Sequence, residues 1–219
     1  MTNFLIVSPP HTAIYTKGIW EKQAYMDPKT KKPKGKPSYQ YIALFDGATD
    51  IADLKRKAAE AAKAEFGANI DFKKVRFPFK NGDAEADRIL KKAAEVAANR
   101  GEEPKKTEKD VAFYRGHTVM KTTSQFPPKV VDNNGEDLLD HDALYSGVKV
   151  RTEFNFKAAE IEEDGETKRY VSAYFNFVMK VGDAKRIQTG GRSAKDVFKG
   201  LLGEKTAEDP TEGMDDIPD

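Results

Sequence analysis

Two long alternating segments in the second half of the chain restrict its fold more than any other feature. Over Leu144–Phe156 and again over Lys168–Val181, apolar side chains recur at every second position. This is the spacing of a β-strand with one buried face. The segment Glu160–Thr167 between them contains Asp164-Gly165, a dipeptide typical of tight hairpin turns. The three segments predict a long antiparallel hairpin, and therefore a protein built on β-sheet.

The alternation divides the side chains of this hairpin between two faces. On the first strand, the apolar face holds Val148, Val150, Thr152, Phe154 and Phe156, and the opposite face holds Lys149, Arg151, Glu153 and Asn155. On the second strand, the apolar face holds Val171, Ala173, Phe175, Phe177 and Met179, and the opposite face holds Tyr170, Ser172, Tyr174 and Asn176. Single strands of nucleic acid are bound by rings that stack on bases and by cations that follow phosphates. Surface tyrosines also serve cross-strand packing, so both interpretations of the outer face stay open.

Shorter elements surround the hairpin. Further strands are predicted at Asn3–Ser8, Thr12–Thr16, Tyr39–Phe45, Val75–Phe79, Val111–Arg115 and Thr118–Thr123. Two alanine-rich helices are predicted at Thr49–Phe66 and Asp83–Arg100, a short one is predicted at Ser193–Leu202, and 102–110 is expected to be a polar linker. Many short antiparallel strands with inserted helices indicate a mainly β fold of the α+β class, organised as a small barrel.

A basic segment lies early in the chain. It contains Lys17, Lys22, Lys29, Lys31, Lys32, Lys34 and Lys36, together with Trp20 and Tyr25, and Tyr39 and Tyr41 follow it. The prolines and glycine of Asp27–Pro37 predict an irregular loop. Lysines beside aromatic rings would neutralise phosphates without reading a base sequence, although such a loop can also serve solubility alone.

The net charge of +1 conceals an uneven distribution. Residues 204–219 contain seven acids and one base and carry −6, so the rest of the chain carries +7. We therefore expect a globular domain at 1–203 and a disordered acidic tail at 204–219. The basic domain suggests a polyanionic partner, for whose surface the tail could compete; a solvated tail without that role is the alternative.

Several classes of protein do not fit the composition. The chain has no cysteine, which excludes a disulfide framework, a thiol nucleophile and a Cys-ligated metal, and which is compatible with the reducing cytosol. No apolar run approaches 18 residues, and the stretch Phe4–Val7 is too short for a signal peptide. We therefore expect a soluble, cytoplasmic protein without a membrane partner.

No catalytic constellation is visible. His11, His117 and His141 are scattered, and the acids Asp137, Asp140 and Asp142 lack the His spacing of zinc enzymes. The segment Thr189–Lys195 matches a phosphate-binding loop only loosely, because no glycine precedes its lysine. The sequence therefore predicts no catalytic residue, no metal and no cofactor.

The order of several motifs resembles a known family. Leu144-Tyr-Ser-Gly-Val148, Tyr170-Val-Ser-Ala-Tyr-Phe-Asn176 and Gly190-Gly191 with Ser193–Phe198 follow Tyr39–Phe45, Phe77–Asp83 and Phe126–Asp132. Over about residues 3–200 the chain is similar to the single-stranded DNA-binding proteins of tailed bacteriophages. The resemblance implies an OB-type β-barrel elaborated by helices, sequence-independent binding of single strands, and a role in phage DNA replication and recombination inside the infected bacterial cell.

The end of the sequence has a resemblance of its own. Met214-Asp215-Asp216-Ile217-Pro218 is similar to the acidic tip of bacterial single-stranded DNA-binding proteins, which recruits replication and repair enzymes. A terminal aromatic residue anchors that tip, whereas Asp219 stands here. The resemblance implies phage or host replication and recombination proteins as partners of Asp215, Asp216, Ile217 and Pro218.

Together these observations lead to one hypothesis with two alternatives. We expect a non-enzymatic protein that coats and protects single-stranded DNA during phage replication, recombination and repair. The alternatives are a strand-annealing recombination protein and a metal-dependent nuclease that uses Asp137, Asp140 and Asp142. The sequence specifies no oligomeric state. The expected DNA-binding residues are Lys17, Trp20, Lys22, Lys31, Lys32, Lys34, Lys36, Tyr39, Tyr41, Lys149, Arg151, Tyr170 and Tyr174.

Overall fold

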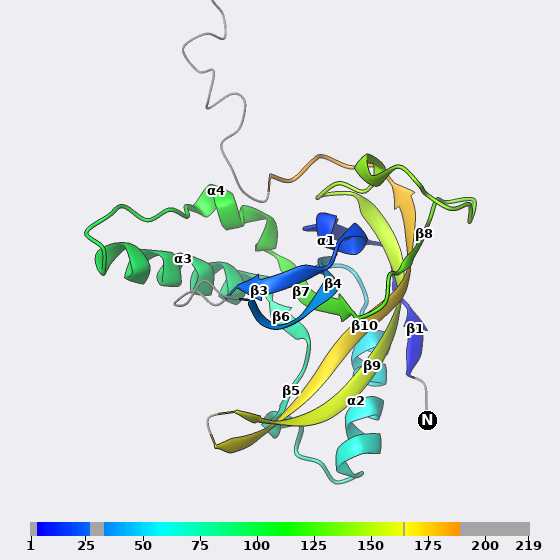
Figure 1. The fold of residues 1–219 in the computed structure, drawn as a ribbon. Helices are drawn as coiled ribbons and strands as arrows, with labels where there is room; N and C mark the ends of the chain where they lie inside the picture. Colours follow the sequence, from blue (N-terminus) through cyan, green and yellow to red (C-terminus); the bar gives the residue numbers. More distant parts are fainter. Residues whose placement is uncertain (1–3, 27–32, 164, 189–219) are drawn as a thin grey trace, which may run out of the picture. The chain divides into compact units, whose positions relative to one another are not determined.

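The computed structural model describes residues 4–26, 33–163 and 165–188 (Figure 1). The strands are β1 (Leu5–Val7), β2 (His11–Ile14), β3 (Gln23–Met26), β4 (Pro33–Asp46), β5 (Val75–Arg76), β6 (Phe79–Asn81), β7 (His117–Ser124), β8 (Lys129–Val131), β9 (Lys149–Glu163) and β10 (Glu166–Gly182). The helices are α1 (Lys17–Trp20), α2 (Ala52–Phe66), α3 (Gly82–Ala98) and α4 (Glu108–Val111), with 3₁₀ turns at Phe72–Lys74, Ala112–Tyr114 and His141–Ala143. The expected sheet-rich fold with a few helices is confirmed.

Five strands pair in a closed order. β2 pairs with β4, β4 with β7, β7 with β10, β10 with β9, and β9 with β2. Four of these pairs are antiparallel, but β7–β10 is parallel, and β10 also pairs in parallel with β5 and β8. The expectation of a wholly antiparallel sheet is therefore wrong at β10. The chain reaches β10 from β7 through β8 and β9, and this is the long connection that a parallel pair requires.

The long hairpin is confirmed as β9 and β10, with one change in its faces. Glu163 pairs with Glu166, and Gly165 between them has a φ of 78°. Val150, Thr152, Phe154 and Phe156 are buried as expected, as are Val171, Ala173 and Phe175. A β-bulge between Phe175 and Phe177 then reverses the alternation, so Val178 is buried and Phe177 is 48% exposed. The assignment of Phe177 and Met179 to the apolar face is therefore wrong, because Met179 lies two residues beyond Phe177 and pairs with the outward Arg151.

The main core lies between the paired strands and α2. The buried side of α2 consists of Leu54, Ala58, Ala61 and Ala62, and these pack in one cluster with the inward side chains of β4, β9 and β10. Alanine lets the helix backbone approach the large rings of Phe154 and Phe156 closely. The helix begins near its predicted start, where the Asp50 carboxylate accepts a hydrogen bond from the Ala52 amide at 2.8 Å.

A second cluster lies under α3. Ile14, Leu44 and Val119 of the strands pack there against Ala86, Val111 and Tyr114. The Asn81 side chain caps α3 by accepting from the Ala84 amide at 2.9 Å. At Gly82 a Cβ would overlap the carbonyl of Tyr114, so only glycine allows this close approach.

Two segments beside α3 differ from expectation. Most of α4 lies in the predicted linker 102–110, and the predicted strand Val111–Arg115 is instead the end of α4 and a 3₁₀ turn. The reason is a capping box in which Thr107 and Asp110 satisfy each other's backbone amides. Val111 and Tyr114 then lie one turn apart and are buried in the α3 cluster.

The basic segment is also more regular than expected. Residues 17–20 form α1, and β4 begins at Pro33 and pairs with β3 at the edge of the sheet. Proline is compatible with the first position of such an edge strand, and Gly35, at a φ of 80°, lies where the register shifts. Lys31, Lys32, the predicted helix Ser193–Leu202 and the acidic tail lie outside the described residues. Within the described ranges, no helix is long and apolar enough to span a membrane.

Candidate nucleic-acid interface

A cavity of about 500 Å³ opens on the outer side of β4 and β7. Its lining comes from the segment after β2, from α1, from β4 and β7, and from the loop before β9: Tyr15, Thr16, Lys17, Gly18, Gln23, Gln40, Tyr41, Ile42, Lys121, Thr122 and Ser146. The lining includes two tyrosines, two lysines and two glutamines, and of the two tyrosines only Tyr15 exposes its ring. A cavity with one ring, cations and amides can accept a base together with a neighbouring phosphate.

Tyr15 is the unusual residue of this wall. It has a φ of 58°, the one positive value at a non-glycine position among the described residues. Its amide donates to Ser146 Oγ at 2.9 Å, which helps to hold this backbone, and the residue is 40% exposed. A tyrosine in this left-handed region of backbone dihedral angles costs about 1–3 kcal/mol of folding free energy. Such a conformation persists where surrounding contacts impose it, and it occurs often at ligand-binding sites. Sequence reasoning missed Tyr15, because nothing in its neighbourhood reveals a positive φ.

A buried carboxylate organises the cations at the edge of the cavity. Glu85 of α3 is 4% exposed and accepts hydrogen bonds from Arg88 at 2.8 and 2.9 Å. Lys80 and Lys121 approach it at 3.4 and 3.5 Å. Burial opposes ionisation, but the hydrogen bond from Arg88 and the charges of the two lysines lower the pKa of Glu85 to about 2. The carboxylate stays ionised and holds Lys121 beside the cavity.

The outer face of β10 carries the two tyrosines that the sequence singled out. Both are half-buried and each has a cation above its ring. The Arg76 guanidinium lies 5.3 Å from the ring centroid of Tyr170 and donates to its hydroxyl at 3.0 Å. Lys157 Nζ lies 5.3 Å from the ring centroid of Tyr174. Ring and cation thus occur as pairs, although Arg76 and Lys157 were not among the expected residues.

The expected cations Lys149 and Arg151 do not lie beside these tyrosines. The register pairs Tyr174 with Asn155 and Tyr170 with Ala159, whereas Arg151 pairs with Met179. Arg151 is four residues along β9 from Asn155, the partner of Tyr174, and therefore about 13 Å from Tyr174 along the strand. Lys149 Nζ instead donates to Thr12 Oγ1 at 2.8 Å, and Arg151 donates to the Ser8 carbonyl at 3.4 Å. The expected grouping is wrong because it used strand faces without the hairpin register.

Tyr41 is also misplaced by the sequence prediction. It is 2% exposed, so its ring is unavailable to a base, and burial raises its pKa well above the ordinary value. Its hydroxyl lies 2.7 Å from Thr152 Oγ1 and 3.1 Å from His11 Nε2. His11 Nδ1 is 3.1 Å from the Pro9 carbonyl, which can only accept, so Nδ1 carries the ring proton. Burial lowers the pKa of His11 to about 4, and the pair forms a polar network inside the core.

Trp20 and the described lysines of the basic segment lie in different surroundings. Trp20 is half-buried and stacks on His141 with ring centroids 4.1 Å apart, and its Nε1 is buried without a hydrogen-bond partner in the described structure. Lys22 Nζ lies 5.6 Å from the ring centroid of Tyr39. Lys17 lines the cavity and pairs with Glu21 at 3.4 Å, and Lys36 is exposed on β4, the strand that also contains Lys34. Of these residues, Lys17 lines the cavity, whereas the ring of Trp20 already stacks on His141.

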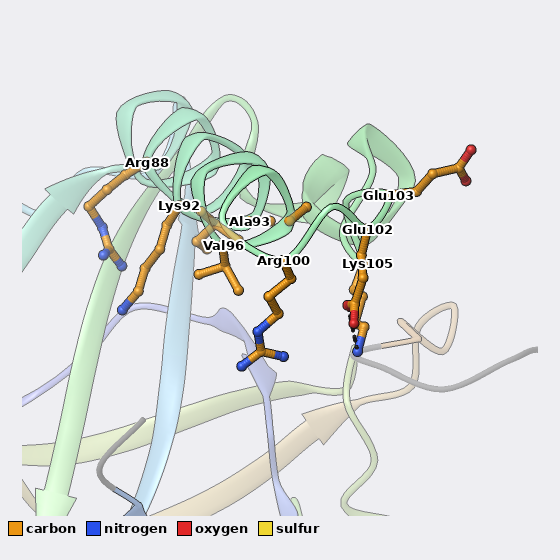
Figure 2. A pocket seen from close by; sticks show the side chains of 10 residues that line it. Arg88, Lys92, Ala93, Val96, Arg100, Glu102, Glu103 and Lys105 are labelled. Atoms are coloured by element: carbon orange, nitrogen blue, oxygen red, sulfur yellow. Dashed lines mark ion pairs between the residues drawn. The ribbon is translucent and has the colours of Figure 1, made fainter. Parts of the chain in front are cut away.

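A second hollow of about 300 Å³ lies along α3, and Figure 2 shows its lining. Arg88, Lys92 and Arg100 project from the helix to the same side around Val96 (Figure 2). Lys105 pairs with Glu102 at 3.5 Å, and Arg88 pairs with Glu85, so part of the positive charge is neutralised locally. This hollow contains no aromatic ring, and it therefore lacks the stacking surface that the β4–β7 cavity and β10 provide.

The acids of the nuclease alternative have local roles. Asp137 pairs with Lys129 at 3.2 Å, and Asp140 caps the 3₁₀ turn His141–Ala143 by accepting from the Asp142 amide at 2.9 Å. Within the described ranges, no group of three or more His, Cys, Asp or Glu side chains is placed to hold a metal ion. These contacts explain the acidic turn as a structural element.

Comparisons with known proteins identify a family and similar folds. The sequence matches, over residues 23–211, the model of a family described as "Enterobacter phage Enc34, ssDNA-binding protein". The fold is similar to a solved structure of the single-stranded DNA-binding protein from bacteriophage Enc34 in complex with ssDNA, at 16% identity and a TM-score of 0.54, covering 84% of this chain and 89% of that chain. Another structure of the Enc34 protein is 17% identical with a TM-score of 0.53 and covers 89% of each chain.

No curated protein sequence matches the chain. The family match nevertheless spans most of its length and includes β3, β4, β7, β9 and β10, the strands that carry most of the cavity and both outward tyrosines. The chain therefore belongs to the family of the single-stranded DNA-binding protein of Enterobacter phage Enc34.

Proposed function

We propose that this protein binds single-stranded DNA without regard to base sequence and coats it during phage DNA replication, recombination and repair in the host cytoplasm. One observation carries the proposal. Gln40 on the cavity wall pairs with Thr123, and Thr123 pairs with Tyr174. Because register partners share a face of the sheet, one outer face leads from the cavity wall at Gln40 through Thr123 to the tyrosine–cation pairs of β10. A strand of DNA that follows this row meets rings and cations in turn.

We also infer that the five paired strands form an OB-type barrel. In chain order they are β2, β4, β7, β9 and β10, and the third strand pairs with the fifth. OB folds bind oligonucleotides on the second and third strands and on the loops after the first and fourth strands. Here these are β4, β7, the basic segment after β2 and the β9–β10 turn. The cavity and the basic segment coincide with this surface, which supports the assignment.

The domain assignment and the tail belong to the same proposal. We assign DNA binding to residues 1–203 and an autoinhibitory role to the acidic segment 204–219. Tethering keeps the −6 charge of that segment at a high effective concentration near a body of opposite charge. DNA would displace the tail, which would free Asp215, Asp216, Ile217 and Pro218 for replication and recombination partners.

A titration of labelled oligothymidine at several salt concentrations tests the proposal. We expect log affinity to fall with log salt at a slope of about −0.7 per phosphate contact. Lys157→Ala should weaken binding and make that slope shallower by about 0.7, whereas Tyr174→Ala should cost about 1–3 kcal/mol with little change in slope. Lys92→Ala, which removes an exposed cation from α3, is the matched control. An affinity that does not change with salt contradicts the proposal.

Two further assays distinguish a DNA-coating protein from the nuclease and from the strand-annealing protein. Incubation of labelled single strands with magnesium or manganese leaves the DNA intact if the protein acts by binding alone, whereas cleavage products would favour the nuclease. Electron microscopy with and without DNA distinguishes a coating protein from the rings or filaments of an annealing protein. We expect intact DNA, because the described acids of the nuclease alternative have structural partners. We also expect coated strands without rings, because the outer row of the sheet suits one strand.

A further inference from the structure

Two phenylalanines at the junction of β7, β8 and β10 are exposed to solvent. Phe126 is 79% exposed and Phe177 is 48% exposed. Large aromatic side chains are usually buried, and neighbouring exposed rings mark interaction sites. Neither ring belongs to the cavity or to the tyrosine–cation pairs described above.

The bulge in β10 is what exposes Phe177. Before it, Tyr174 faces outward and Phe175 inward; after it, Phe177 pairs with Glu153 and faces outward, while Val178 is buried. The extra residue, Asn176, donates from Nδ2 to a Glu153 carboxylate oxygen at 3.1 Å, which holds the bulge in place. Phe177 therefore shares the outer face of Tyr174 and lies no more than about 10 Å from it along the strand.

The register also explains Phe126. On β10 the chain advances three residues from Tyr174 to Phe177, whereas their parallel partners Thr123 and Lys129 are six residues apart. The surplus residues leave the sheet as a loop that contains Phe126. Ser124 Oγ donates to the Phe126 carbonyl at 2.8 Å, and the two prolines that follow restrict the backbone further. The backbone that carries the exposed Phe126 ring therefore has little conformational freedom.

We propose that Phe126 and Phe177 form an aromatic subsite that stacks on unpaired bases beyond Tyr174 and lengthens the DNA path. This inference rests on the proposed function. The occupant follows from continuity, because Phe177 extends the outer row of β10 beyond Tyr174, the row that the proposed function assigns to DNA. Stacking on a phenyl ring is tolerant of base identity, so the subsite adds affinity without sequence preference.

The experiment compares full-length variants on oligothymidines of increasing length. Phe126→Ala and Phe177→Ala should each weaken binding to long oligonucleotides by about 5- to 150-fold, the range for loss of one stacked base, and leave binding to the shortest bound oligonucleotide unchanged. Phe126→Leu and Phe177→Leu should lose nearly as much, because leucine keeps an apolar surface but cannot stack. Val96→Ala, at a residue 43% exposed on α3, is the control for loss of exposed apolar surface.

Ultraviolet crosslinking to bromodeoxyuridine-substituted DNA gives a second readout that does not depend on stability. Crosslinks located at Phe126 or Phe177 are expected, together with crosslinks at Tyr174. Normal affinity of all four phenylalanine variants, full affinity of the leucine variants, or crosslinks confined to other segments would overturn the subsite. A changed sedimentation profile without changed DNA affinity would also overturn it, because the rings would then serve a protein contact. Failure of the wild type to bind any single strand would instead overturn the proposed function.

Discussion

Acidification should weaken the fold through His11. The ring is buried and its pKa is lowered from 6.5 to about 4, chiefly by burial and to a smaller extent by the charge of Lys149. The unfolded chain therefore takes up a proton at a higher pH than the native protein does. Stability contributed by the neutral ring is present above pH 6.5 and is lost as the pH falls toward 4.

The size of this loss follows from the shift. At 1.36 kcal/mol per pKa unit, protonation of the unfolded state costs the native state about 3 kcal/mol between pH 6.5 and 4. That is a large share of the roughly 5–15 kcal/mol by which a domain is stable. The protonated ring would also have no acceptor for Nε2 except the Tyr41 hydroxyl, which now donates to that nitrogen.

Urea unfolding of the wild type and of His11→Gln at half-unit steps from pH 7.5 to 4 measures this effect. Glutamine removes the titration, and every other group cancels in the difference between the two free energies of unfolding. We expect the wild type to lose about 3 kcal/mol relative to the variant across that range. A difference that stays constant with pH would refute the assignment of a buried neutral imidazole.

Three further predictions concern the α3 junction and the tail. Gly82→Ala should lower the melting temperature measured by calorimetry strongly, because the added Cβ would overlap the Tyr114 carbonyl. Ala84→Gly, a milder change in the same helix, is the control. Glu85→Gln should lower the free energy of unfolding in urea by about 1–3 kcal/mol at pH 7 and should not change it below pH 2. The ionised carboxylate stabilises the fold above pH 4.5, and this contribution is lost as the pH falls toward 2. Ending the chain at Gly203 should tighten oligothymidine binding at low salt and should matter less as salt rises; equal affinities at low salt would contradict competition by the tail.

The local patterns of the sequence were sufficient for the long elements and for most of the core, but not for α1, α4 and the 3₁₀ turn at Ala112–Tyr114. Alternation over β9 and β10 and the alanine-rich stretches of α2 and α3 are nearest-neighbour signals that reflect how each element buries one face. They identified the long hairpin, the two long helices and the inward rings of Phe154, Phe156 and Phe175. The outward position of Tyr170 and Tyr174 followed from the same period of two residues. The family resemblance, carried by the order of motifs, indicated the class of ligand.

Tertiary structure alone decided which of these residues meet. The strand register depends on the turn, the bulge and all the neighbouring strands. It places Lys157 over the ring of Tyr174 and pairs Thr123 with Gln40 across the sheet, and it separates Arg151 from these residues. Burial of Tyr41 depends on His11 and Thr152, which come from two other strands. The strained backbone of Tyr15 and the outward turn of Phe177 likewise arise from contacts distant in sequence. Composition and periodicity report what one segment needs to bury, whereas a binding surface depends on which segments lie side by side.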